Sequence, residues 1–452
     1  MNKSISSTQT YDEEGRPRIS KFKIDNGPNT TISDVGYTTR EELKYSYQGK
    51  VGSNYLQRTD YTYEFHGPLK RINSTSLQGT EQAWDVCTDP NMSTPSNELQ
   101  TKDLFRLELY YNNNIPGVTT NKQKNGNIAG ITWQVKGRSE GIYTFTYDTH
   151  NRLTDADYAD RDDGVLDNND RYGTEYDYDQ RGNLTQISRK GMYDTNGCLN
   201  QGTIDAMLLS YPSNSNQLTD VSDFAPSNAD QEGYDDPGTN TNQYDANGNM
   251  TAYPDKGITI LYNHLNLPRR VFITGTQHSI LFTYDAAGNL LRRQNYTFPA
   301  GGGKKIDYIS GIEYLDEEVH QIMHGEGYVQ YTNGSNPQYH YTINDHLGNT
   351  RLVYSDLDGN GIIEHETNDE NKKEIVQENH YYPFGMKMKG PWMGDENEFR
   401  YKYNGIEEVD DFGLGLSFAV FRTLDPTIGR WLQLDPKAEW GFNMNPYNSM
   451  QN

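Results

Sequence analysis

One stretch in the second half of the chain has the residue types and spacing of a metal loop. The sequence "DLDGNG" at 356–361 offers Asp356, Asp358 and Asn360 as alternate oxygen donors, with Gly361 at the sharp turn. This is the beginning of the D-x-[DN]-x-[DN]-G pattern of calcium loops. Calcium is therefore the one cofactor that the sequence suggests.

The end of the same loop departs from the calcium pattern. The acid expected at the twelfth position is missing, because Thr367 occupies it, and an acid nearby would have to substitute for it. Candidates for that substitution are Glu364, Glu366 and Asp369. An acidic Asp-Gly hairpin loop without a metal explains the same residues, so both interpretations stay open at this point.

Other catalytic patterns are missing from the sequence. No glycine-rich phosphate loop is present. Ser417 in "GLS" lacks the Gly-x-Ser-x-Gly elbow of a nucleophilic serine. A run of aspartates is best interpreted as a solvated insertion with a turn at Gly164; it comprises Asp155, Asp157, Asp160, Asp162, Asp163, Asp167 and Asp170.

A repeated phrase indicates the elements that carry these residues. "QYDANGNM" at 243–250 returns with variations at 10–18, 146–154, 177–185 and 283–291. Asp245 followed three residues later by Gly248 fits a type I turn, whose aspartate bonds backbone N–H groups and whose glycine takes the positive φ that follows. Each phrase therefore predicts a hairpin tip, at which a Tyr ends one strand and an apolar residue begins the next. At the tip of Asp148, Asn151 replaces the glycine, and Asn is the usual substitute at positive φ.

The composition favours an all-β protein. Few aliphatic residues and a net charge of −23 would by themselves suggest disorder. However, the 35 Tyr lie beside Val, Ile, Thr and Phe in runs such as "GIYTFTYD" and "ILFTYD", which are typical of strands. Tyrosine rings can replace aliphatic bulk in a sheet that is wet on one side, since the hydroxyl keeps a polar partner. We expect one short helix, near 368–378, where "NDENKKEIVQE" collects polar helix formers.

Charge and hydropathy exclude two classes of partner. A net charge of −23 without a basic cluster argues against binding to nucleic acid. No apolar run approaches the roughly 20 residues of a membrane span, and the first ten residues lack a signal-peptide core. We therefore expect the chain as given to be soluble. If it is exported, the export signal must lie outside this sequence. Cys87 and Cys198 are interpreted as unrelated thiols, although a disulfide between them stays open.

The repeated phrases resemble the YD repeats of Rhs proteins, of the B and C components of bacterial Tc toxins, and of teneurins. The C-terminal stretch resembles the Rhs repeat-associated core of Bacteroidetes-type proteins in four segments: "NDHLGNTRLVYSD" at 344–356, "ENHYYPFGMKM" at 378–388, "YKYNGIEE" at 401–408 and "LDPTIGRWLQLDPKAEW" at 424–440. The resemblance covers essentially the whole chain. It divides the chain into a YD-repeat shell at 1–343 and the repeat-associated core at 344–452.

The resemblance implies an antiparallel β-hairpin strip that spirals into a hollow or partly open shell. In such families the shell encloses a C-terminal toxin and helps to deliver it, the core closing one end. The implied partners are that cargo or a component of the secretion machinery, and a second shell chain where one chain is too short to close. The implied location is secreted or at the cell surface, by a delivery system. An alternative function is a cell-surface adhesin whose exposed tyrosines bind glycans or proteins.

Any enzymatic activity would lie in the core, where the resemblance implies self-cleavage by two aspartates. The first belongs to a Gly-Arg-aromatic…Asp-Pro segment, which here contains Arg430 and Asp435. The second belongs to a later Asp-Pro-x-Gly segment, which would begin where this sequence reads "NPYNSMQN". Because one carboxylate cannot act as both acid and base, we expect the chain as given to be inert as a protease. Arg430 is assigned a supporting role beside Asp435, and a plain turn before Pro436 is the alternative for Asp435.

Overall fold

The computed structural model describes residues 4–65, 67–73, 103–162, 164–195, 198–226, 232–238, 241–331, 337–364, 373–390, 399–441 and 444–449. The chain forms two compact units. The first comprises Met1–Thr144, Ala159–Asn168 and His320–Glu378, and the second comprises Phe145–Tyr158, Asn169–Val319 and Asn379–Asn452.

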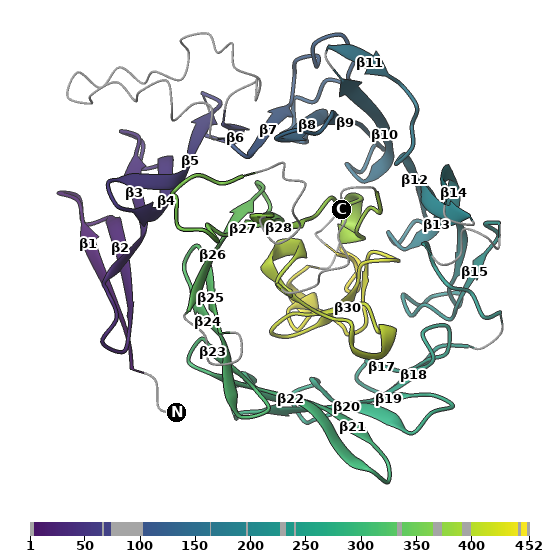
Figure 1. Cartoon of the computed structure of the whole chain (residues 1–452). Helices are drawn as coiled ribbons and strands as arrows, with labels where there is room; N and C mark the ends of the chain where they lie inside the picture. Colours follow the sequence, from purple (N-terminus) through teal and green to yellow (C-terminus); the bar gives the residue numbers. More distant parts are fainter. Residues whose placement is uncertain are drawn as a thin grey trace. The chain divides into compact units, whose positions relative to one another are not determined.

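Consecutive strands pair in chain order, as a strip of hairpins requires (Figure 1). The first sheet has 15 strands, with β11 paired to β10 beside the main path. Its strands are β1 (Ile5–Tyr11), β2 (Pro17–Ile24), β3 (Thr30–Tyr37), β4 (Leu43–Val51), β5 (Asn54–Tyr63), β6 (Leu69–Ile72), β7 (Phe105–Tyr110), β8 (Gly130–Val135), β9 (Glu140–Tyr147), β10 (Leu153–Asp162), β11 (Val165–Asp167), β12 (Thr174–Tyr178), β13 (Leu184–Thr195), β14 (Cys198–Ser210) and β15 (Asp220–Asp223).

The second sheet has 13 strands and continues the same pattern. Its strands are β16 (Gln243–Tyr244), β17 (Met250–Tyr253), β18 (Ile258–Tyr262), β19 (Pro268–Ile273), β20 (His278–Tyr284), β21 (Leu290–Thr297), β22 (Gly301–Ile309), β23 (Ile312–Leu315), β24 (Glu318–His324), β25 (Gly327–Gln330), β26 (Gln338–Asn344), β27 (Thr350–Tyr354) and β28 (Ile375–Glu378). The division expected between residues 343 and 344 stays a prediction.

A small third sheet of four strands lies near the C-terminal end. It consists of β29 (Glu407–Val409), β30 (Leu416–Phe418), β31 (Thr423–Asp425) and β32 (Arg430–Trp431). Helical structure among the described residues is limited to short 3-10 turns, namely η2 (Pro383–Gly385), η3 (Tyr403–Gly405), η4 (Asp411–Gly413) and η5 (Ala438–Trp440). No helix in the described part of the chain is long and apolar enough to cross a membrane.

The all-β, antiparallel fold class is therefore confirmed, but the helix expected near 368–378 is wrong in its described part. Ile375–Glu378 is strand β28, which pairs with β27 through Val353 and Gln377. Helix propensity is a weak preference, and here the free edge of β27 with burial of Ile375 outweighs it. Residues 368–372 lie outside the described part of the chain, as does Cys87, so a Cys87–Cys198 pair stays untested.

The turns at the repeated phrases have the predicted geometry. Gly182, Gly248 and Gly288 have φ of 78°, 80° and 89°, and Asn151 has φ of 63°. In each tip the N–H of this residue donates to the carbonyl of the aspartate three residues earlier, as Gly248 does to Asp245 at 3.1 Å. The sequence therefore predicted these tips correctly.

The asparagine after each turn glycine has a role that the sequence did not indicate. The Asp245 carboxylate accepts hydrogen bonds from the backbone N–H groups of Asn247 and Asn249, each at 2.9 Å, and from the side-chain amide of Asn249 at 2.8 Å. Asp179 with Asn183, Asp285 with Asn289, and Asp345 with Asn349 repeat this set of bonds. A carboxylate thus closes each tip with three charge-assisted bonds.

The tyrosine before the aspartate connects each tip to the previous hairpin. The hydroxyl of Tyr178 donates to the carbonyl of Leu153 at 2.8 Å, and that of Tyr244 donates to Leu218 at 3.0 Å. The rings are largely buried, which raises the pKa of these hydroxyls because burial disfavours the phenolate. Tyr and Asp therefore recur together because one residue joins neighbouring hairpins while the other closes the turn.

In the first unit, tyrosines provide much of the packing between strands far apart in sequence. The Tyr354 hydroxyl donates to Gln48 Oε1 at 2.8 Å, and Gln48 Nε2 donates to the Thr342 carbonyl at 3.1 Å. The Tyr341 ring lies so close to Gly49 that a Cβ there would come within 2.8 Å of it. Strand β4 thereby packs against β26 and β27 of the same unit.

In the second unit, the small sheet packs on the hairpins through one large apolar cluster. The cluster joins side chains of β10, β12–β15 and β17–β20 to Val409, Leu414, Leu416 and Leu432. Phe282 stacks on Phe418 with ring centroids 4.8 Å apart. This packing fixes the C-terminal segment against the hairpin tips.

A buried ion network adds directional contacts between the same parts. Arg293 of β21 pairs with Asp411, and Arg400 donates to Glu407 at 2.9 Å and also pairs with Glu313 of β23. Breaking a buried pair leaves an uncompensated charge, so separating the C-terminal segment from these strands would destabilise the unit.

Candidate functional site

Asp435 lies in a tight turn after β32. Its N–H donates to the carbonyl of Pro446 at 3.0 Å, and its Oδ1 accepts from the N–H of Lys437 at 2.8 Å. One carboxylate oxygen is thus used as a turn aspartate would use it. The other is available for an ion pair, and 38% of the side-chain surface remains exposed.

The arginine at this carboxylate is Arg422, which the sequence did not single out. Arg422 Nη2 lies 3.0 Å from Asp435 Oδ2, and its guanidinium stacks on the Trp431 ring, 4.4 Å from the centroid. Partial burial lowers the pKa of Arg422, because the charged form loses solvation. No local sequence signal marks Arg422, because its position depends on strand pairing: the antiparallel pair Leu424–Trp431 brings residues before Leu424 beside those after Trp431.

Arg430, predicted to support Asp435, has other contacts. Its guanidinium lies between the rings of Tyr211 and Tyr447, at 5.2 and 4.6 Å from their centroids, and donates to the carbonyl of Asn216. The side chain is 2% exposed. Arg430 therefore fastens the C-terminal segment to the strip, while Arg422 makes the ion pair with Asp435.

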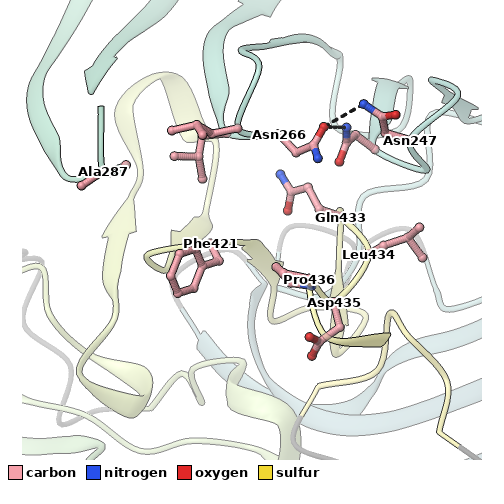
Figure 2. Close-up of a pocket in the computed structure, with 12 residues that line it drawn as sticks. Asn247, Asn266, Ala287, Phe421, Gln433, Leu434, Asp435 and Pro436 are labelled. Carbon is pink, nitrogen blue, oxygen red and sulfur yellow. Dashed lines mark hydrogen bonds between the residues drawn. The ribbon is translucent and has the colours of Figure 1, made fainter. Parts of the chain in front are cut away.

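Asp435 lies on the wall of a pocket of about 320 Å³ within the second unit (Figure 2). The pocket is lined by Asn247, Asn249, Leu265, Asn266, Leu267, Ala287, Gly288, Phe421, Gln433, Leu434, Asp435 and Pro436. Apolar side chains form one part of the wall and amides another. Such a combination suits a ligand that has an apolar group and hydrogen-bonding groups.

The hairpin tip at Gly248 positions the wall that carries Asp435. A Cβ on Gly248 would lie within 2.6 Å of Leu434 and 2.9 Å of the Tyr447 hydroxyl, so only glycine fits. The Tyr447 hydroxyl donates to the Gly248 carbonyl at 2.8 Å, and the Met250 N–H donates to the Leu432 carbonyl at 3.0 Å. The repeated turn thus also serves as the seat of the C-terminal segment.

The predicted calcium loop forms a self-bonded turn in the first unit. Asp356 accepts from the N–H groups of Gly359 and Gly361, at 2.8 and 3.0 Å. Asp358 accepts from the N–H and the side-chain amide of Asn360, each at 2.9 Å. The Oδ1 of Asn360, the third predicted donor, accepts a hydrogen bond from the backbone N–H of Ile362 at 2.7 Å.

A third carboxylate, Glu374, joins the two aspartates of this loop. Oxygens of Asp356, Asp358 and Glu374 all lie within 4.8 Å of one another. Glu374 is buried, which raises its pKa, and the nearby Asp356 raises it further. The calcium-loop pattern did not point to Glu374, because this residue lies far beyond the twelfth position of the loop. Of the substitutes considered, Glu366 and Asp369 lie outside the described residues, and Glu364 contributes its N–H to Glu374 at 2.8 Å.

Comparisons with known proteins give a clear result for the fold only. No family model and no curated protein sequence matches the chain. Solved structures match over 99% of it: the crystal structure of TcdB2-TccC3-TEV, with a TM-score of 0.66 and 18% identity, and the Tc holotoxin pore of Photorhabdus luminescens, with 0.65 and 18%. TcdB2-TccC3 without its hypervariable C-terminal region matches equally, at 0.65 and 18%.

The chain covers 20% of the length of each of these Tc toxin chains. At this identity the similarity supports an Rhs-like shell fold and nothing more specific. The fold class expected from the sequence is thus shown, and the activity, cargo and partners remain matters for proposal.

Proposed function

We propose that this chain is part of an Rhs-type shell that encloses a C-terminal toxin and helps to deliver it. The observation that carries the proposal is the match of 99% of the chain to TcdB2-TccC3 structures, one of which is described without a hypervariable C-terminal region. The Tyr-Asp tips support it, because they build a strip that can be extended hairpin by hairpin.

The finer parts of the proposal derive from the core motifs. We assign the chain to the Bacteroidetes-type Rhs proteins, with a shell at 1–343 and a core at 344–452, acting in competition between bacteria after export by a delivery system. The cargo, a secretion component and a second shell chain are the proposed partners.

Asp435 is proposed as one half of a self-cleaving pair, with its partner carboxylate in sequence beyond Asn452. In such a pair one carboxylate accepts a proton from the water that attacks the scissile carbonyl, while the other carboxyl group donates one to the nitrogen that leaves as an amine when the C–N bond breaks. The position of Asp435 on a pocket wall, held by Arg422 at 3.0 Å, supports this role.

The test uses the complete gene product, including all sequence beyond Asn452. We expect the downstream polypeptide to resist protease until the shell is unfolded, and to be cut from the shell in the wild type but not in Asp435→Asn. Equal cutting of both would remove Asp435 from the mechanism. A stop codon or an anchoring domain directly after Asn452 would overturn the toxin proposal and favour the adhesin.

A further inference from the structure

The C-terminal segment already binds to the hairpin tips of the second unit. The side-chain amide of Asn448 donates to the carbonyl of Gly182 at 2.9 Å, and the hydroxyl of Tyr447 donates to that of Gly248 at 2.8 Å. Both acceptors are backbone carbonyls of turn glycines. These tips therefore form a surface that binds polypeptide.

The next two tips contribute to the pocket. The turns at Asn266 and Gly288 line it, together with Asp435 from the C-terminal segment. The binding surface thus continues from residues 445–448 directly into the pocket that Asp435 borders.

The apolar part of the wall suits one large apolar side chain. The side chains of Leu265 and Phe421, which line the pocket, are 38% and 62% exposed. Exposed apolar side chains grouped in this way are typical of a binding surface. A pocket of about 320 Å³ lies at the small end of the range of ligand pockets. It is large enough for a Leu, Met or Phe side chain with a short stretch of backbone.

The polar part of the wall suits a peptide group. The side-chain amides of Asn247 and Asn249 both donate to Asn266 Oδ1, at 3.0 and 2.9 Å, which fixes the orientation of the Asn266 amide. Figure 2 shows the amide nitrogen of Asn266 on the side facing Gln433 and the pocket. That group can donate to a backbone carbonyl.

We propose that the pocket is a specificity subsite that seats a large apolar side chain of the enclosed polypeptide beside Asp435. The proposal rests on the proposed function, which supplies the enclosed polypeptide. The pocket continues the surface that holds residues 445–448, and this continuity indicates that its ligand is a polypeptide. A side chain held there would bring the adjoining peptide bonds to the Asp435 carboxylate.

The test replaces Phe421 by the photo-reactive residue benzoylphenylalanine in the complete gene product and maps the cross-links by mass spectrometry. We expect cross-links to a downstream segment that contains a large apolar residue. Ala287→Trp, which fills the pocket, should lower the yield at least tenfold. Ala286→Trp is the control, since it changes the neighbouring residue of the same turn outside the pocket.

A second pair of variants tests whether a lower cross-linking yield results from misfolding. Leu265→Asp should lower the yield like Ala287→Trp, whereas Leu291→Asp, at a similarly exposed leucine outside the pocket, should not. Cross-links confined to residues 1–452, or equal yields in the filled and control variants, would overturn the subsite. Protease protection of the downstream polypeptide reports on the enclosing function separately, so either proposal can fail alone.

Discussion

Arg422 Nη2 lies 3.0 Å from Oδ2 of Asp435, which lines the pocket together with eleven other residues. The two residues come from different parts of the small sheet, the tip between β30 and β31 and the turn after β32. The orientation of the carboxylate therefore depends on how the hairpin folds back on Trp431. If Asp435 acts in cleavage, Arg422 is its positioning residue.

We predict that Arg422→Met slows self-cleavage of the complete gene product about tenfold or more, because misplacement of a reacting group by an ångström can cost a larger factor. A partly exposed ion pair adds at most about 1 kcal/mol to stability, so the fold should persist. Arg422→Lys should restore part of the rate. Processing is followed on gels over time, with Arg269→Met at an exposed arginine as the control. A rate unchanged in Arg422→Met would exclude the positioning role.

Gly248→Ala should destabilise the protein more than Gly257→Ala. Both glycines have positive φ, at 80° and 59°, so both substitutions strain the backbone by about 1 kcal/mol. Only at Gly248 would the new Cβ meet Leu434 and Tyr447, and overpacking adds about 1–3 kcal/mol. Urea melts measure the difference, and proteolysis should show the segment at 430–449 released in Gly248→Ala alone. Equal melts would mean that the C-terminal segment does not depend on this tip.

These features differ in how far the sequence could predict them. The positive φ of Gly248 and its hairpin follow from four adjacent residues, since turn chemistry is local. Arg422 beside Asp435 depends on strand pairing, and Glu374 beside Asp356 depends on a return of the chain after 18 residues. The β28 strand was missed for the same reason, because the edge of β27 decides its conformation. Local patterns thus gave the strip and its tips, whereas the contacts of the site required the three-dimensional register.

Calcium is expected to stabilise the loop at 356–361 if the three carboxylates bind it. Asp356, Asp358 and Glu374 repel one another when ionised, and a cation would relieve this while using oxygen ligands that calcium prefers. The melting temperature should rise in millimolar calcium and fall in chelator for the wild type, and Glu374→Gln should remove the response. Glu364→Gln is the control, because that residue contributes its backbone N–H. Identical melts with and without calcium would leave the acidic hairpin interpretation.

Acid should destabilise the first unit through His340. Burial lowers the pKa of His340 to about 4 from an ordinary value of 6.5, and its ring stacks on Tyr328 at 4.6 Å. As the pH falls below 6.5, the unfolded chain binds a proton at this residue before the folded chain does. The free energy of unfolding is therefore highest above pH 6.5 and decreases as the pH falls toward 4. His340→Phe keeps the ring stack without a titrating group. It should therefore remove up to about 3 kcal/mol of the decrease in unfolding free energy at low pH. Urea melts at several pH values test it, with exposed His264→Phe as control. Parallel pH profiles would contradict the assignment.

Asp255 should give the opposite dependence on pH in the second unit. Burial raises its pKa to about 6 from 3.8, and the hydroxyl of Tyr234 donates to its Oδ2 at 2.7 Å. Above pH 3.8 the unfolded chain loses this proton first, so stability falls as the pH rises to about 6 and stays lower above it. Asp255→Asn keeps an acceptor for Tyr234 without the charge, and should raise the free energy of unfolding at pH 8 by on the order of 1–2 kcal/mol, with little gain at pH 4. Urea melts at the two pH values compare it with Asp235→Asn, an exposed control two residues after Gly233. A gain at pH 8 no larger than at pH 4 would show that the Asp255 carboxylate is not the group that costs stability there.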